Sequence, residues 1–164
     1  MTIRTLFSVT LAALLLTGCA QMNGPSGSGT VPTDRDGQAS PPPEEIAEIV
    51  AAPPPRAGAR TADQFDTTTD AQRQAARAAP TGGEQRLGEV VASLGDPTEP
   101  GLWVKTALVD AQRSGRLEYP GSGQSAVVEL RPLPGGGGAQ VSLAAMRLLE
   151  APLTDLPTLI VYGN

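Results

Sequence analysis

The sequence predicts a mainly β fold with one short helix, in which a small barrel-like domain follows a long disordered linker. From residue 84 onward, short apolar runs alternate with proline and glycine, which is the pattern of short β-strands joined by turns. Before residue 84 large apolar side chains are few, and proline triplets stand at 41–43 and 53–55. An apolar stretch at the N-terminus precedes the only cysteine of the chain.

The N-terminal segment indicates export and lipidation. Residues 6–16 are mostly apolar and stand behind Arg4, and the last of them begins the tetrapeptide Leu16-Thr17-Gly18-Cys19. This stretch has the length of a signal-peptide core and is shorter than the ~20 residues that span a bilayer. The tetrapeptide resembles the lipobox of bacterial lipoproteins. The resemblance implies a signal peptide over residues 1–18, cleavage between Gly18 and Cys19, and diacylglycerol and palmitate chains on Cys19.

Several acyl chains on one residue would hold the protein stably in a membrane, since each buried methylene contributes about 0.8 kcal/mol. Ala20, rather than aspartate, follows the cysteine. In lipoproteins of Gram-negative bacteria this resembles the default for sorting to the outer membrane. We therefore expect a protein of the bacterial cell envelope, lipid-anchored on the periplasmic face of the outer membrane, with the inner membrane as the alternative.

The composition excludes several classes of function. The chain of 164 residues has a formal net charge of −5 and no histidine. An acidic chain has no electrostatic footprint for nucleic acid. Without histidine it lacks the usual general base and the commonest metal ligand, and lipidation of Cys19 would leave no free thiol. We expect no nucleic-acid partner, no metal, no cofactor and no catalytic residue.

Residues 19–83 predict a disordered tether rich in proline, glycine and alanine. They carry too little apolar surface to offset the entropy of ordering the backbone. Residues 44–52 and 71–79 are candidate helices, the second capped by Thr69-Asp70, but each is shorter than an isolated helix needs in water. The favoured interpretation is a spacer, and the alternative is that a proline triplet docks a partner.

Residues 84–164 predict the folded domain. Val104 and its alternate neighbours form the apolar face of one strand, and Trp103 and Lys105 lie on the other face. Ser142 is expected to cap the single helix. A closed barrel would leave no free strand edges. The elements expected are strands at 87–94, 102–109, 116–119, 125–133 and 158–162, a helix at 143–150, turns at 114–115 and 120–123, and a flexible loop at 135–138.

The order of three segments resembles the double-psi β-barrel of the rare lipoprotein A family. They are Ala126-Val127-Val128-Glu129-Leu130, Val141-Ser142-Leu143-Ala144-Ala145-Met146 and Leu159-Ile160-Val161. The resemblance covers roughly residues 88–162 and implies an outer-membrane lipoprotein on a long linker. Family members that cleave glycan carry an Asn-Asp-Arg-Gly-Pro-like motif with a functional aspartate after the central strand. Here Arg131-Pro132-Leu133-Pro134-Gly135 follows that strand, so the resemblance implies binding or scaffolding without cleavage.

A second resemblance concerns the segments Leu94-Gly95-Asp96-Pro97 and Gly101-Leu102-Trp103-Val104-Lys105-Thr106. They are similar to segments of short alphaproteobacterial lipoproteins, some of which are labelled D-galactarate dehydratase. Sugar-acid dehydratases of that kind are much larger and depend on a metal. We therefore interpret the label as transferred.

Candidate functional side chains are few. Trp103 and Tyr119 are candidate contacts for a sugar ring or a partner protein, with packing in the core or at its rim as the alternative. Ser122 and Ser125 have no histidine partner and are expected in turns. Acid–base chemistry would need two carboxylates ~5–9.5 Å apart, and the candidates are Glu89, Asp96, Glu99, Asp110, Glu118 and Glu129.

These observations favour a non-enzymatic protein that presents its domain to peptidoglycan or to an envelope protein. The alternative is a divergent glycan-cleaving enzyme of the rare lipoprotein A type that works through carboxylates alone. The sequence leaves the oligomeric state open.

Overall fold

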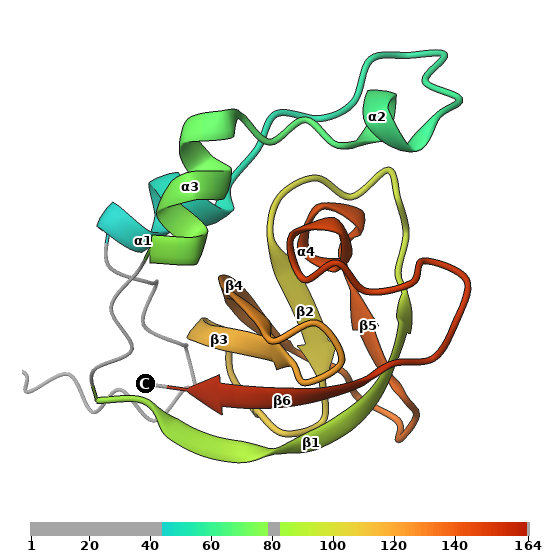
Figure 1. Ribbon diagram of the computed structural model, residues 1–164. Helices are drawn as coiled ribbons and strands as arrows, with labels where there is room; N and C mark the ends of the chain where they lie inside the picture. The colour runs from blue at the N-terminus through green and yellow to red at the C-terminus, as the bar shows by residue number, and fades with distance from the viewer. Residues whose placement is uncertain (1–43, 79–82, 164) are drawn as a thin grey trace, which may run out of the picture. The chain divides into compact units, whose positions relative to one another are not determined.

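The computed structural model describes residues 44–78 and 83–163. The predicted signal peptide, Cys19 and tether residues 19–43 and 79–82 lie outside the described residues. The elements, shown in Figure 1, are α1 (Glu44–Val50), α2 (Ala62–Phe65), α3 (Asp70–Ala78), β1 (Gln85–Leu94), β2 (Trp103–Thr106), β3 (Arg113–Tyr119), β4 (Gln124–Pro132), β5 (Ala139–Val141), α4 (Leu143–Leu148) and β6 (Thr158–Gly163).

The six strands close into a barrel in the order β1-β5-β2-β4-β3-β6. Two neighbouring pairs, β1 with β5 and β2 with β4, run parallel. The other four pairs are antiparallel. The prediction of a mainly β, barrel-like domain is confirmed. Closure pairs both edges of every strand, so the domain has no open sheet edge within the part of the chain that the structure describes.

Alternate side chains of β4 point into the hydrophobic core of the barrel. Ala126, Val128 and Leu130 are at most 1% exposed and belong to the hydrophobic core, as the sequence predicts. Val127 and Glu129 on the opposite face are also buried, because α1 and α3 pack against β4. The strand is therefore covered on both faces, which a period-two pattern with polar residues does not indicate.

Gly115 lies in the middle of β3, opposite Val128 of β4 and Gly163 of β6. The prediction of a turn at 114–115 is wrong. A Cβ atom at this glycine would lie 2.4 Å from the carbonyl oxygen of Tyr162 and 2.6 Å from Leu130. Glycine is present here because β3 approaches β6 and the core closely. A glycine in the sequence can therefore mark a close backbone approach within a strand as well as a turn.

Other boundaries differ from the expected ones by a few residues. β2 ends at Thr106 and α4 ends at Leu148, whereas the expected strand and helix run to 109 and 150. The short strand β5 was not predicted. The cap of α4 is confirmed, because the Oγ of Ser142 accepts a hydrogen bond from the backbone of Ala145 at 3.3 Å.

Residues 44–78 contain the three helices α1, α2 and α3, whereas the sequence predicts a disordered tether over residues 19–83. Val50 and Ala76 are buried in the same hydrophobic core as the strands. The helices and the barrel also belong to one compact unit. Short helices that are marginal alone are stabilised when an apolar face packs on another element, and composition averaged over the segment hides such contacts.

No helix among residues 44–78 and 83–163 combines the length and the apolar character that crossing a bilayer requires.

Candidate functional site

Trp103, the aromatic residue singled out in the sequence, lies in β2 next to Glu129 of β4. Its side chain is 0% exposed, although it is not part of the barrel core. The Nζ of Lys105 lies 4.7 Å and the guanidinium carbon of Arg131 5.4 Å from the centre of the ring. The Nε1 of the indole donates a hydrogen bond to the carbonyl oxygen of Glu99 at 3.2 Å. The indole is therefore a covered platform for two cations.

These cations join two carboxylates into one network. Glu99 accepts from the Nζ of Lys105 at 2.6 Å and from the Nη1 of Arg131 at 2.5 Å. Arg131 also donates to Glu129, which accepts in addition from the side-chain amide of Gln112. The Trp103 cluster, as we call it, consists of Glu99, Trp103, Lys105, Glu129 and Arg131.

A cleft of about 380 Å³ lies beside the Trp103 cluster. Glu99, Glu129 and Arg131 provide its charged wall. Its other wall is made of small apolar residues at the end of α1 and after it, together with Pro100: Ala47, Val50, Ala51 and Ala52. The cleft therefore combines hydrogen-bonding groups with a shallow apolar surface, in the size range of sites for small molecules.

Of the six candidate carboxylates, the structure brings together only Glu99 and Glu129, and both are bound by Arg131. Glu89 forms an exposed ion pair with Arg86. Asp110 is exposed.

Asp96 and Glu118 are engaged elsewhere. Hydrogen bonds from the side chain and backbone of Thr98 hold the pKa of Asp96 below its usual value. Glu118 accepts from Arg116 at 3.4 Å and from the hydroxyl of Tyr162 at 3.0 Å. These two carboxylates therefore act in local structure and do not form an acid–base pair.

Tyr119 does not join Trp103 in one aromatic surface. Its partner on β4 is Gln124, five residues from Glu129, the partner of Trp103. At the rise of a strand this spacing corresponds to about 16 Å. Tyr119 is partly buried and packs against the core. A Cβ atom on Gly121 would lie 2.4 Å from its ring, so the 120–123 turn lies directly against it.

Sequence reasoning missed Arg131 as a site residue. The only signals were Lys105, which follows Trp103 by two residues, and Arg131, which follows Glu129 by two. Lys105 and Arg131 pair in the parallel register of β2 and β4. A parallel register between strands distant in sequence is not encoded in either segment alone.

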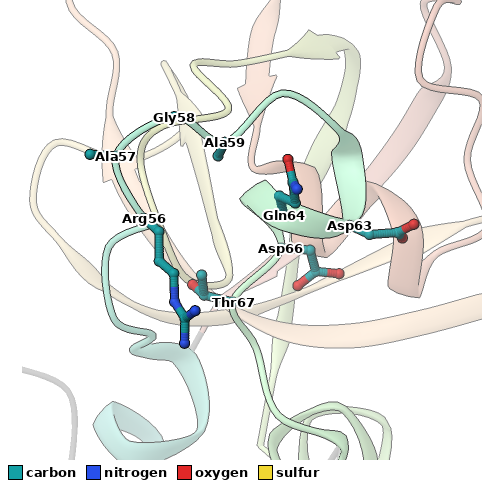
Figure 2. Close-up of a pocket in the computed structure, with 8 residues that line it drawn as sticks. All are labelled: Arg56, Ala57, Gly58, Ala59, Asp63, Gln64, Asp66 and Thr67. Carbon is teal, nitrogen blue, oxygen red and sulfur yellow. The ribbon is translucent and has the colours of Figure 1, made fainter.

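A second hollow, of about 440 Å³, lies in the segment around α2 and holds none of the predicted site residues. Figure 2 shows Arg56 on one side of it and Asp63 on the other. No group of three or more acidic or cysteine side chains is placed to hold a metal ion among the residues that the structure describes.

Comparison of the chain with protein-family models, with curated proteins and with solved structures gives no match.

Proposed function

We propose that this protein is a lipid-anchored component of the bacterial cell envelope whose domain binds or scaffolds and catalyses no reaction. The observation that carries the proposal is Leu16-Thr17-Gly18-Cys19 behind an apolar stretch of signal-peptide length. Acylation of Cys19 would place the domain at the periplasmic face of the outer membrane, in reach of peptidoglycan and of other envelope proteins.

The state of the carboxylates supports a role without catalysis. Glycan cleavage by two carboxyl groups requires one that donates a proton and one that acts as base or nucleophile. Glu99 and Glu129 are each bound to the same guanidinium. Both carboxylates are therefore engaged in ion pairs within the protein, which favours a structural role for them.

For the ligand we propose peptidoglycan, bound in the cleft beside the Trp103 cluster. Arg131, which lines the cleft, is 28% exposed and presents N–H donors, while Glu99 presents acceptors. Sugar hydroxyls and peptide groups need donors and acceptors of this kind together with an apolar surface. Trp103 would act beneath these groups by holding the two cations in position, since its ring has no exposed surface.

The resemblance to the double-psi β-barrel stays part of the proposal. A closed barrel of six strands with two parallel pairs supports it. Glycan cleavage of the rare lipoprotein A type is the outcome that a zymogram on purified peptidoglycan would reveal. A cleared zone that disappears in Glu129→Gln would replace the binding role with an enzymatic one.

Metabolic labelling tests the anchor. Cells that express the full chain are grown with a palmitate analogue, and we expect label on the wild-type protein and none on Cys19→Ala. Separation of the two membranes on a density gradient should place the labelled protein in the outer-membrane fraction. Label that persists in Cys19→Ala would contradict the anchor.

Co-sedimentation with insoluble peptidoglycan tests the ligand. We expect the full chain to sediment with the sacculi and Arg131→Gln to sediment several-fold less. Arg86→Gln is the matched control, because Arg86 lies on β1 in an exposed ion pair away from the cleft. Equal sedimentation of all three proteins would exclude the cleft as the binding site.

A further inference from the structure

A third cavity, of about 440 Å³, collects three arginines from two helices. Arg73 and Arg77 come from α3, and Arg147 comes from α4. The remaining lining residues are Asp63, Asp66, Thr68 and Leu148. We call this the arginine cavity. It shares no residue with the Trp103 cluster or with the cleft beside it.

A buried carboxylate, that of Asp66, binds the arginines on the inner side of the arginine cavity. The side chain of Asp66 is 4% exposed and accepts from the backbone and hydroxyl of Thr68 at 3.2 and 2.5 Å. It also accepts from the Nη1 of Arg147 at 3.1 Å and lies 3.8 Å from the Nη1 of Arg73. One nitrogen of each of these guanidinium groups is therefore positioned by the protein itself.

The outer nitrogens of the same two arginines are bound by exposed carboxylates. The Nη2 of Arg73 lies 2.5 Å from Asp70, whose side chain is 88% exposed. The Nη2 of Arg147 lies 2.6 Å from Asp63, whose side chain is 82% exposed. Ion pairs at such exposure contribute little, because water and salt screen them. Asp63 and Asp70 can therefore be replaced at these nitrogens by a better anion.

Arg77 adds a third guanidinium with spare donors. Its Nη2 donates to the carbonyl oxygen of Leu148 at 3.3 Å, and no carboxylate pairs with it among the residues that the structure describes. Asp63 lines the cavity, and Asp70 lies outside it but pairs with Arg73. While both stay paired, the charges of the three arginines and of Asp63, Asp66 and Asp70 cancel. When these two swing out, three positive charges remain against Asp66 alone, which leaves two in excess.

We propose that the arginine cavity binds a phosphoryl dianion, with Asp63 and Asp70 as exposed carboxylates that the ligand displaces. A phosphomonoester carries about −1.5 to −2 charges at neutral pH, which matches the excess. Guanidinium groups present N–H pairs that fit phosphoryl oxygens bidentately. The donor is either a soluble phosphate or the phosphomonoester headgroup of a lipid, which share this chemistry. The site is independent of the proposed peptidoglycan contact.

Calorimetric titration of the full chain tests the site with two probes, inorganic phosphate and dihexanoyl phosphatidic acid, a soluble lipid phosphomonoester. We expect saturable binding of at least one. Arg77→Gln should weaken it about ten-fold, because a hydrogen-bonded charge is lost. Asp63→Asn should tighten it several-fold, because a competing carboxylate is removed. Arg60→Gln is the control, since Arg60 is exposed and lies outside the cavity.

The opposite signs expected for Arg77→Gln and Asp63→Asn make the test robust to a variant that folds poorly, and thermal unfolding of each variant checks this. Saturation by phosphate assigns a soluble source, and saturation by the lipid alone assigns a headgroup. No saturation with either probe at millimolar concentration would overturn the proposal. It would also be overturned if Arg60→Gln weakened binding as much as Arg77→Gln, or if Asp63→Asn weakened it.

Discussion

At the scale of single residues, Trp103 is unusual because its aromatic ring is buried beneath charged side chains. Its side chain is fully buried, yet its neighbours along and across the strands are Lys105, Glu129 and Arg131. Long cationic side chains can cover an apolar ring with their stems while their charged heads stay near water. The ring in turn restrains the two cations by cation–π attraction. The result is a rigid charged surface over an aromatic base.

Space for the indole depends on Gly95, where a Cβ atom would lie 2.5 Å from the Cη2 of Trp103. We expect Gly95→Ala to lower the free energy of unfolding by about 1–3 kcal/mol, the usual cost of overpacking. Urea unfolding followed by tryptophan fluorescence measures it. Gly137→Ala is the control, because nothing lies within 4 Å of a Cβ atom there. Equal losses in the two variants would show that Gly95 is not constrained by Trp103.

The ion pair of Glu84 with Arg116 has side chains only 5% and 11% exposed and an Oε2–Nε distance of 2.7 Å. Burial lowers the pKa of Arg116, but the hydrogen bond and charge of Glu84 outweigh this effect and the pKa is raised. We expect Glu84→Gln to cost about 3 kcal/mol of unfolding free energy, because it leaves the buried Arg116 with only its longer contact to Glu118 at 3.4 Å as an ion pair. Chemical denaturation at neutral pH gives the value.

Glu89→Gln provides the comparison for Glu84→Gln. Glu89 pairs with Arg86 at 2.6 Å, but both side chains are more than half exposed. Screened pairs of this kind contribute at most about 1 kcal/mol. If Glu89→Gln proved as costly as Glu84→Gln, burial would not be what distinguishes the two pairs.

At the scale of elements, α1 and α3 are too short to be stable alone and are held by specific contacts. The Nε2 of Gln72 in α3 donates to the carbonyl oxygen of Glu48 in α1 at 3.0 Å. The backbone N–H of Leu102, just before β2, donates to the carbonyl oxygen of Val50 at 2.8 Å. In Figure 1 the two helices lie against each other beside the barrel. They are stable because they cover the outer face of β4.

α4 is joined to β2 by its own cap. The Oγ of Ser142 accepts from the backbone of Ala145 and, at 3.1 Å, from that of Trp103. We expect Ser142→Ala to cost about 2–4 kcal/mol, because it removes a cap and leaves a buried N–H group unsatisfied. Thr61→Ala at the exposed cap of α2 should cost about 0.5 kcal/mol. Thermal unfolding of both variants tests this, and a cost below that of Thr61→Ala would refute the buried role of Ser142.

At the scale of the whole molecule, the barrel and the helices before it depend on one core. Val50 and Ala76 belong to the same core as residues of all six strands. We expect deletion of residues 20–78 to lower the unfolding midpoint strongly or to cause aggregation, because the outer face of β4 would be exposed. Deletion of residues 20–43 should leave the midpoint unchanged, since the sequence predicts a tether there.

Circular dichroism on the two truncated proteins and the full chain measures these midpoints. A barrel that unfolds at the same temperature without residues 20–78 would show that the helices are dispensable. It would restore the boundary at residue 84 that the sequence predicts.

The sequence by itself determined the elements whose signals are local. The alternation of apolar and polar residues over 125–133 predicted β4. Ser142, which precedes an apolar helical pattern, predicted α4. Both signals are local, because side-chain periodicity and helix capping involve residues only a few positions apart. The lipobox-like Leu16-Thr17-Gly18-Cys19 is local in the same sense, and it predicts an anchor independently of any fold.

Only the tertiary structure decided which distant residues meet. The parallel register that pairs Lys105 with Arg131, the burial of Trp103 beneath them and the docking of α1 and α3 on β4 all join segments far apart in sequence. Such contacts depend on closure of the barrel and on the free energy of burying one shared core. No window of the sequence contains both partners of these contacts, which is why they were not predicted.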